Sequence, residues 1–432
     1  MTDILGTCYK VPTKEYQWRS AVECPSYDLV KEPSEGGKKQ YAIATKIQQQ
    51  EQDAVIGKTI IQKHGSYIVV QNPPMPPLST EELDHIYELP FMRNYHPSYE
   101  SLGGVPGIEE VKFSLAHNRG CFGACNFCSI AYHQGRQVTT RSHESVLREA
   151  KQLTELPDFK GYIHDVGGPT ANFRFPSCKK QETQGMCKNR KCLAPKICPQ
   201  VHVDHSDYLK LLSAIRKLPK IKKVFIRSGI RFDYLIADPN DTFFKELVRH
   251  HVSGQLKVAP EHCSAAVLAA MGKPEIETYL QFKKRFYELT KSEDKEQFLV
   301  PYLMSSHPGS TPKDAVELAV FLKREGLRPE QVQDFYPTPG TVSTCMFYTE
   351  LDPYTMEKIY VPKTMKEKAQ QRALLQYFKP ENRALVLSAL KAAHRTDLIG
   401  TGPNCLVLPD KGFVPQTKKK KTIRNIHKKK KK

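Results

Sequence analysis

Residues 111–128 read VKFSLAHNRGCFGACNFC, a short apolar run of β type that ends in three cysteines. The cysteines are Cys121, Cys125 and Cys128, spaced C-x3-C-x2-C. Structural zinc sites and fully ligated iron–sulfur clusters take four protein ligands, so three close thiolates indicate a [4Fe–4S] cluster with one iron left open. The alternative is a zinc site that His117 or His133 completes.

The residues around the three cysteines suit an anionic metal site. Gly120 and Gly123 allow the backbone to approach a cluster closely. Phe127 offers a stacking face between the last two thiols, and Arg119 adds positive charge.

The composition is that of a globular protein. The chain has 432 residues with 39% hydrophobic content, enough for one core of about 200–300 residues and smaller appendages. It has no run of about 18 apolar residues, and its first residues, MTDILGTCYKVPTKEYQW, lack a basic start and an apolar signal core. We expect a cytoplasmic or organelle-matrix protein. Twelve cysteines, seven of them in two clusters, favour metal binding over disulfides.

The net charge of +19 is concentrated near the carboxyl end. Residues 418–432, KKKKTIRNIHKKKKK, hold ten Lys or Arg and no acid. Such a run cannot bury an apolar face, so we predict a disordered tail. It either has no specific partner or attracts RNA or another polyanion loosely.

Four parts of the chain are expected. Residues 1–104 form an amino-terminal lead-in, with helical spacing over 41–52, a β-type stretch over 66–70 and a proline-rich linker, NPPMPPLS, at 72–79. Thr80 or Ser79 caps the short helix that follows. The remaining parts are the core at 105–330, a carboxy-terminal extension at 331–410 and a disordered basic tail at 411–432.

From residue 109 onward, short apolar runs alternate with helical ones. Strands are expected at 111–116, 161–166, 223–228, 255–259, 297–304 and 331–336, and helices at 142–156, 208–218, 242–251, 276–290 and 312–326. This alternation predicts an α/β fold with parallel strands. Periodicity leaves both a partial barrel and a doubly wound sheet open.

Functional groups are expected at the carboxyl ends of such strands. The first strand ends at the cysteine loop, and the next two end at DVGGPTAN and IRSGIRFD. The fourth and fifth end at VAPEH and SSHPG. Each ending supplies small or polar residues in the same layer, namely Gly167, Gly168, Ser228, Gly229, Arg231, Glu261, His262 and His307.

The cysteine motif, with Phe127 as the aromatic residue in C-x3-C-x-Φ-C, resembles the signature of the radical S-adenosylmethionine (SAM) superfamily. RGCFGACNFCSI, DVGGPTANFR, SGIRFDYLI, HHVSGQLKVAPEH, VPYLMSSHPGSTP and QVQDFYPTPGT together resemble YgiQ-type members of that superfamily, over residues 60–405. The resemblance implies a partial (β/α)6 TIM-type barrel with a carboxy-terminal extension. Members of the family carry a longer amino-terminal region, so we expect this chain to lack most of it.

The resemblance also implies roles for single residues. The three cysteines hold a [4Fe–4S] cluster whose open iron chelates SAM, beside Phe127. Gly167 and Gly168 correspond to the glycine-rich contact to the SAM amino group, and Ser228 and Arg231 approach ribose or carboxylate. The cluster, reduced by an electron donor, cleaves SAM to a 5′-deoxyadenosyl radical that removes a hydrogen atom from the substrate.

A second group of cysteines follows the second strand, in CKKQETQGMCKNRKCLAPKIC. Four thiols suffice for a closed site, and ligand count fits tetrahedral zinc and an auxiliary [4Fe–4S] cluster equally. Thiols without a metal are the third alternative. Six basic residues between them would offset thiolate charge or touch an anionic substrate. The cysteines are Cys178, Cys187, Cys192 and Cys198.

We therefore predict a radical SAM enzyme whose partners are SAM, an electron donor and a substrate, with weak nucleic-acid contact through the tail. The competing class is a non-catalytic, metal-stabilised nucleic-acid-binding protein that uses both cysteine groups as zinc modules. Iron content after anaerobic purification distinguishes the two classes.

Overall fold

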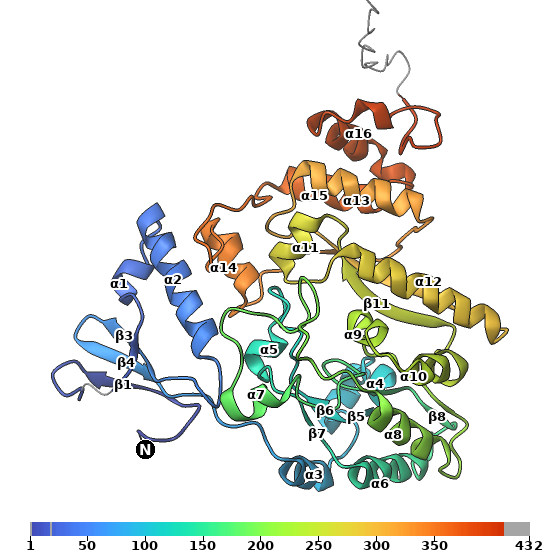
Figure 1. Ribbon diagram of the computed structural model, residues 1–432, viewed down its shortest axis with the longest axis horizontal. Helices are drawn as coiled ribbons and strands as arrows, with labels where there is room; N and C mark the ends of the chain where they lie inside the picture. The colour runs from blue at the N-terminus through green and yellow to red at the C-terminus, as the bar shows by residue number, and fades with distance from the viewer. Residues whose placement is uncertain (1, 18–19, 410–432) are drawn as a thin grey trace, which may run out of the picture. The chain divides into compact units, whose positions relative to one another are not determined.

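A computed structural model describes residues 2–17 and 20–409 (Figure 1). The chain forms two compact units. The larger one comprises residues up to Thr311 together with Gln331–Pro362, and the smaller one comprises Pro312–Glu330 and residues from Lys363 onward. The four-part division of the sequence stays a prediction, and the predicted tail at 411–432 lies outside the described residues.

The amino-terminal part of the larger unit is a small sheet with a helix beside it (Figure 1). The strand order is β1-β4-β3-β2, with antiparallel pairing of β4 to β1 and β3 and parallel pairing of β2 to β3. The sequence predicted the second half of the helix and β4, but it missed the other strands; β1 and β2 alternate between half-buried and exposed residues, and β3 buries Ile60 and Ile61. The elements are β1 (Cys8–Pro12), β2 (Val22–Glu23), α1 (Tyr27–Val30), α2 (Glu35–Glu51), β3 (Ile60–His64) and β4 (Tyr67–Gln71).

Helix α3 (Thr80–Glu88) follows the proline-rich linker, as predicted. The Ser79 side chain accepts a hydrogen bond from Glu82 N, and the Glu82 carboxylate accepts one from Ser79 N. This capping box satisfies two backbone donors at the helix start, so Ser79 and not Thr80 is the cap.

The rest of the larger unit alternates strands and helices. The strands are β5 (Ser114–Ala116), β8 (Tyr162–Ile163), β9 (Asp165–Gly167), β10 (Lys223–Val224), β11 (Gln255–Glu261), β12 (Phe298–Ser305) and β13 (Gln333–Asp334), and the main helices are α6 (His143–Thr154), α8 (Ser206–Arg216), α10 (Thr242–Glu246) and α12 (Ile276–Ser292). Shorter elements are η1 (Pro97–Leu102), α4 (Ile108–Val111), β6 (Asn118–Arg119), α5 (Ile130–His133), β7 (Thr139–Thr140), α7 (Lys179–Gln184), α9 (Phe232–Ile236), η2 (Leu247–His251), α11 (Ala265–Met271) and α14 (Val342–Thr349).

Apart from β6 and β7, which pair antiparallel, the strands of this mixed α/β part pair in parallel, as predicted, but in separate short ladders. These are β5 with β9, β8 with β10, and β12 with both β11 and β13. Backbone hydrogen bonds from Val166 N to Phe225 O and from Ile226 N to His251 O, both 3.1 Å, link neighbouring segments. Four of the predicted strands differ in their bounds. Val111 ends α4 and does not begin a strand, the second predicted strand is divided into β8 and β9, the third stops at Val224, and the sixth covers only Gln333–Asp334.

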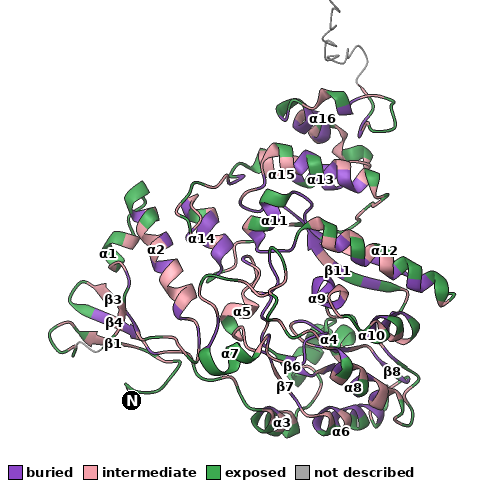
Figure 2. Cartoon of the chain, viewed as in Figure 1, coloured by how far each residue is buried: buried purple, intermediate pink, exposed green. Residues whose placement is uncertain are grey.

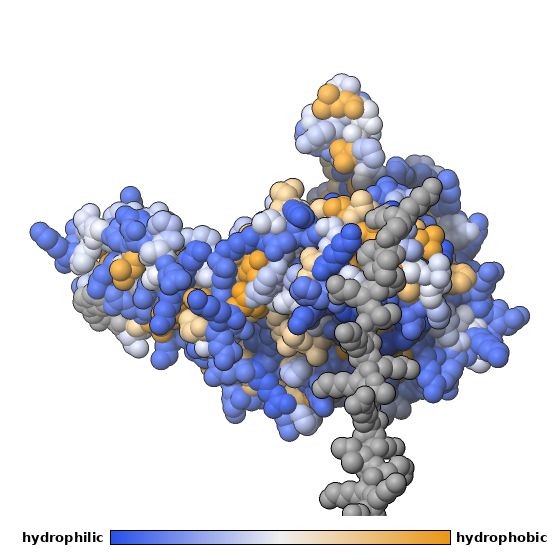
Figure 3. Space-filling view, turned by 90° about the horizontal axis from the view of Figure 1, so that it is seen from above, coloured by the Kyte–Doolittle hydropathy of each residue, from blue (hydrophilic) through white to orange (hydrophobic). Residues whose placement is uncertain are grey.

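Each of the longer helices buries one apolar stripe, which explains their 3.6-residue spacing. Helix α6 buries Val146, Ala150 and Leu153, and α12 buries Phe282 and Phe286 among others. Buried (purple) and exposed (green) residues alternate along these helices in Figure 2. Figure 3 shows a face on which hydrophilic residues predominate and hydrophobic ones gather in smaller patches.

The smaller unit is helical in its described part. Ala315, Val316, Ala319, Leu374 and Leu390 belong to its buried cluster. Its elements are α13 (Pro312–Arg324), α15 (Met365–Leu375), η3 (Pro380–Asn382), α16 (Arg383–Ala392) and η4 (Thr396–Leu398). Among all described residues, no helix combines the length and the apolar character needed to cross a bilayer.

Candidate active site

The cysteine loop follows β5 and β6, at the carboxyl end of the first strand. Gly120 has φ +80°, and a Cβ atom there would lie 2.0 Å from Gln137 O, so only glycine fits. Ala124 also has a left-handed φ, of 45°, which is strained for a residue with a side chain. The backbone of the loop is therefore tightly constrained just before Cys121 and between Cys121 and Cys125.

The three thiols of this loop are half-buried and lie within electrostatic reach of one another. Burial, with smaller contributions from Cys125 and Cys121, raises the pKa of the Cys128 thiol to about 11. The Cys121 Sγ lies 3.5 Å from Thr170 Oγ1. In the described part of the chain, no three His, Cys, Asp or Glu side chains are arranged as a metal site. As a donor set, however, three soft thiols on one loop match the ligands that iron–sulfur clusters take.

Arg231, at the start of α9, reaches this loop from the third strand. Its Nη1 donates to Cys125 Sγ at 3.3 Å, while Nε and Nη2 donate to the Asp233 carboxylate at 2.8 and 2.5 Å. Burial lowers the pKa of Arg231, but Asp233 and Cys125 raise it more strongly. A fixed, buried positive charge therefore lies against one of the three thiols. The family resemblance predicts that Arg231 contacts SAM. A sequence motif alone cannot show which group an arginine that follows a strand contacts.

The glycines after the second strand have no room for side chains. A Cβ atom on Gly167 would lie 1.8 Å from Ser228 Oγ, and one on Gly168 would lie 1.7 Å from Asn118 Oδ1. The Ser228 hydroxyl donates to the Asp165 carboxylate. Asn118 Oδ1 is buried and has no hydrogen-bond partner among the described residues. It is an unoccupied acceptor beside Gly168, and the sequence analysis did not single it out.

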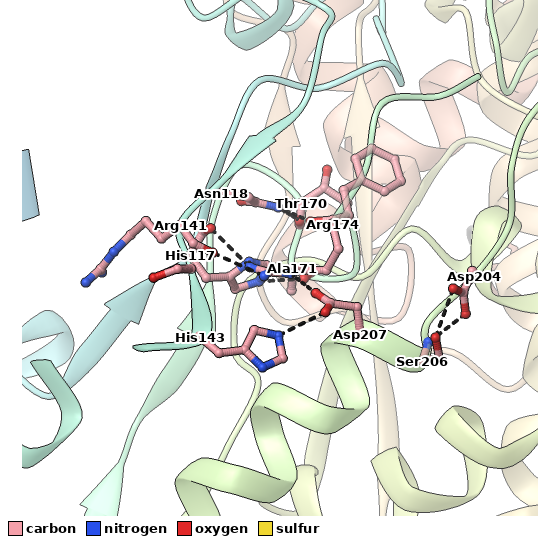
Figure 4. A network of polar contacts seen from close by, with 12 residues as sticks. His117, Asn118, Arg141, His143, Thr170, Ala171, Arg174, Asp204, Ser206 and Asp207 are labelled. Atoms are coloured by element: carbon pink, nitrogen blue, oxygen red, sulfur yellow. Dashed lines mark hydrogen bonds and ion pairs between the residues drawn. The ribbon is translucent and has the colours of Figure 1, made fainter. Parts of the chain in front are cut away.

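His117 belongs to a polar network with Arg174 and Asp207 (Figure 4). Arg174 Nη1 donates to His117 Nδ1 at 3.2 Å, and His117 Nε2 donates to Ala171 O at 2.9 Å. Arg174 Nε also donates to Asp207 at 2.6 Å. Burial, and then Arg174, lower the pKa of His117 to about 3. Both ring nitrogens are thus engaged, which argues against His117 as the fourth ligand of a zinc site; His133 is exposed on α5.

Phe127 packs into a hydrophobic cluster with Val267, Met271 and Phe335. Its ring meets the buried His307 ring edge-on, with 6.1 Å between centroids. The fourth and fifth strands end in strained, buried residues: Glu261 has φ 68° and Ser306 has φ 63°. Strain of this kind concentrates at functional sites, and it supports the prediction that strand ends carry function.

The four cysteines of the second group are half-buried, and two of them lie close to the same serine hydroxyl. Ser177 Oγ lies 3.9 Å from Cys178 Sγ and 3.4 Å from Cys192 Sγ, and Cys198 N donates to Cys192 O at 2.8 Å. Burial raises the pKa of the Cys192 thiol, which Cys178 and Cys187 raise further. Lys180 Nζ lies 3.8 Å from Cys187 Sγ. A metal at this group stays a prediction.

A cavity of about 450 Å³ opens beside Cys125 and Cys128. Its walls come from α2, the cysteine loop, residues 188–191, residues 340–342 and Tyr354. Sequence reasoning missed it because these segments are far apart along the chain. Among the described residues that line it, none is acidic and five are basic: Lys46, Arg136, Lys188, Arg190 and Lys191.

Lys191 joins this cavity to the cysteine loop. Its Nζ donates to Ala124 O and, at 2.6 Å, to Asn126 Oδ1. Burial lowers the pKa of Lys191 to about 8, against the opposing effect of Cys125. The second cysteine segment thus holds the first one in place through this lysine.

Comparison with known proteins gives two family matches. Residues 1–114 match a family described as radical SAM N-terminal, and residues 330–432 match a domain of unknown function, DUF3362. A UPF0313 protein of Clostridium botulinum strain 657 is 58% identical over 396 residues, which is 92% of this chain and 61% of that protein. A UPF0313 protein of Clostridium perfringens strain 13 is 56% identical over 411 residues, covering 95% of this chain and 61% of that one. The chain thus spans about three fifths of the length of these relatives.

Solved structures with a similar course of the chain are more distant. The cobalamin-dependent SAM radical enzyme OxsB, with aqua-cobalamin and SAM bound, has a TM-score of 0.41 and 12% identity over 79% of this chain and 51% of its own. The radical SAM methyltransferase TsrM of Kitasatospora setae, with cobalamin and a [4Fe–4S] cluster bound, has a TM-score of 0.33 and 11% identity over 77% of this chain and 71% of its own. Similarity at this level carries no argument about function.

Proposed function

We propose that the chain is a radical SAM enzyme, which the match of residues 1–114 to the radical SAM N-terminal family supports, and that it binds a [4Fe–4S] cluster through Cys121, Cys125 and Cys128 and SAM at the open iron. The observation that carries the proposal is the cysteine loop itself. Three half-buried thiols lie on one short loop at the end of the first strand, and a buried guanidinium donates to one of them. Cys121, Cys125 and Cys128 would hold the cluster, which, after reduction by an external electron donor, would supply the electron that breaks the S–C5′ bond of SAM, giving methionine and a 5′-deoxyadenosyl radical able to take a hydrogen atom from the substrate.

The residues around the loop have distinct tasks in this proposal. Arg231, fixed by Asp233, offsets the negative charge of the thiolates and donates a hydrogen bond to Cys125, an interaction that tunes the reduction potential of such clusters. Asn118 Oδ1, which is buried beside Gly168 without a hydrogen-bond partner among the described residues, would accept a hydrogen bond from the SAM ammonium, and a side chain on Gly168 would displace it. Ser228 donates to Asp165, so toward SAM its oxygen would act as an acceptor.

We further propose that the core is a partial (β/α)6 TIM-type barrel. The parallel ladders β5/β9, β8/β10 and β11/β12/β13 support it, as do the hydrogen bonds that link Val166, Phe225, Ile226 and His251 between ladders. In such a fold the strand ends with Gly167, Arg231, Glu261 and Ser306 would face one mouth.

The proposal is tested by metal analysis of anaerobically reconstituted protein. We expect about four iron atoms per chain at the cysteine loop, and SAM cleavage to 5′-deoxyadenosine upon reduction. Cys125→Ala should lose both, because each cysteine is one of only three protein ligands. The matched control is Cys8→Ala, at an exposed, isolated cysteine, which should keep both. Unchanged iron content at this loop in Cys125→Ala would contradict the assignment.

A further inference from the structure

We propose that the cavity beside the cysteine loop binds a phosphorylated nucleoside, either a free nucleotide or a nucleotide of single-stranded RNA, as the substrate of the enzyme. The inference rests on the proposed function, because it treats Cys125 and Cys128, which line the cavity, as part of the reacting centre. The charges and the aromatic rings of the other lining residues indicate which class of ligand the cavity binds.

The charge of the cavity is strongly positive. Of its five basic residues, only Lys188 forms an ion pair, with Glu51 at 2.5 Å, in the described part of the chain. Arg136 Nη1 and Nη2 donate to the carbonyl oxygens of Cys187 and Arg190 at 3.2 and 3.1 Å. These bonds fix the guanidinium without neutralising it. Crowded cations with no carboxylate among the lining residues favour a bound polyanion.

The cations also have donors to spare. Lys46 Nζ donates to Tyr354 O at 3.1 Å, and an ammonium group has three N–H bonds in all. Arg190 is exposed at the mouth, and Arg136 Nε is buried with no hydrogen-bond partner among the described residues. Multiple N–H donors around a small space match the oxygens of a phosphate group.

SAM does not match this charge. Its sulfonium and ammonium groups outweigh its single carboxylate, so the four basic lining residues that form no ion pair within the described residues would repel it on balance. Gly167, Gly168 and Ser228, which are predicted to contact SAM, do not line the cavity. The cavity therefore approaches the thiols from a different side than the predicted SAM residues and suits a second ligand.

Two tyrosines supply the surface for a base. Tyr132 and Tyr354 are both half-buried and line the cavity. Tyr132 is fixed: Gln52 Nε2 donates to its carbonyl at 3.0 Å, and a Cβ atom on Gly340 would lie 2.9 Å from its ring, so the backbone packs directly against it. Aromatic rings of this kind stack on nucleobases and stabilise their binding without regard to sequence. The volume of about 450 Å³ is that of a typical small-ligand site, roughly 300–1,000 Å³.

Binding is measured directly, by calorimetry for the four ribonucleoside 5′-monophosphates, their nucleosides, inorganic phosphate and SAM, and by fluorescence anisotropy for a labelled single-stranded octaribonucleotide. The test variant is Lys46→Gln/Arg190→Gln. The control is Lys39→Gln/Lys210→Gln, which removes the same charge from exposed positions outside the cavity. We expect the test variant to bind a nucleotide or the octaribonucleotide about tenfold more weakly than wild type, and the control to bind as wild type does.

The outcomes separate this inference from the proposed function. Binding of monophosphates identifies a free nucleotide, and binding of the octaribonucleotide alone identifies RNA. Equal affinity for nucleotide and inorganic phosphate, equal loss in the test and control variants, or weakening of SAM binding alone would each overturn the inference. Binding is recorded with and without the cluster. Charge-dependent nucleotide binding in protein that takes up no iron would defeat the proposed function only, and SAM cleavage without nucleotide binding would defeat this inference only.

Discussion

Gly123 lies in the cysteine loop after the first strand, at the place where the side chain of Arg231, which follows the third strand, approaches the loop. A Cβ atom at this position would lie 2.8 Å from Arg231 Nη1 and 3.3 Å from Cys121 Sγ. Arg231 cannot easily withdraw, because Asp233 holds its other two nitrogens. The sequence predicted that Gly123 allows a close approach, but the group that approaches is a side chain more than a hundred residues away.

We expect Gly123→Ala to lower the iron content of reconstituted protein and to lower the free energy of unfolding by about 1–3 kcal/mol, as overpacking usually does. Gly229→Ala is the control, since a Cβ atom there would meet nothing within 4 Å and the glycine has no left-handed φ. Iron analysis and urea unfolding measure the two effects. Full iron content and wild-type stability in Gly123→Ala would show that Arg231 does not hold the position described.

His117 should make stability depend on pH. Its pKa is about 3 in the folded chain and about 6.5 in the unfolded one. Between these values the unfolded state binds more protons, so the stability from this group is complete above pH 6.5 and falls as pH decreases. The loss at pH 5 is about 2 kcal/mol. Urea unfolding at pH 7.5 and 5 should show a smaller difference in His117→Gln than in wild type. In His85→Gln, at an exposed residue, the difference should match that of wild type.

Among the elements, those with strong periodicity were the predictable ones. Helices α6, α8 and α12 and strands β11 and β12 lie within a few residues of their expected bounds, because each buries a continuous apolar stripe or run. Val111 is apolar but exposed and lies in α4. Periodicity could not show that this residue is helical and lies outside the core. Strand β1 was missed because its residues alternate between exposed and half-buried, and only Tyr9 and Val11 pack against a buried cluster.

The second cysteine loop is the element whose chemistry is still a prediction. We expect Cys178, Cys187, Cys192 and Cys198 to bind a metal independently of the first group. Protein with alanine at Cys121, Cys125 and Cys128 should retain about four iron atoms if the site is an auxiliary cluster, or about one zinc ion if it is structural. Absence of both metals, with four thiols open to alkylation, would show that the loop is no metal site.

For the whole molecule, sequence motifs located the cysteine loop but not its surroundings. The contacts of Arg231 with Cys125, of Lys191 with Ala124 and of Gln49 with Gly340 join segments far apart in the chain. Such contacts depend on tertiary packing, which no local pattern encodes. The strand-end residues Gly167, Ser228 and Glu261 could be predicted as a layer because parallel strands present their carboxyl ends together.

The basic tail at 418–432 lies outside the described residues, and its charge makes a separate prediction. Deleting it should leave iron content and SAM cleavage unchanged, because no part of the proposed site comes from it. Affinity for the octaribonucleotide should decrease, and the slope of log K against log salt should become shallower, since fewer phosphates are neutralised. Lys46→Gln/Arg190→Gln should weaken the remaining RNA affinity in the truncated protein as well. Loss of SAM cleavage upon truncation would mean that the tail forms part of the active site.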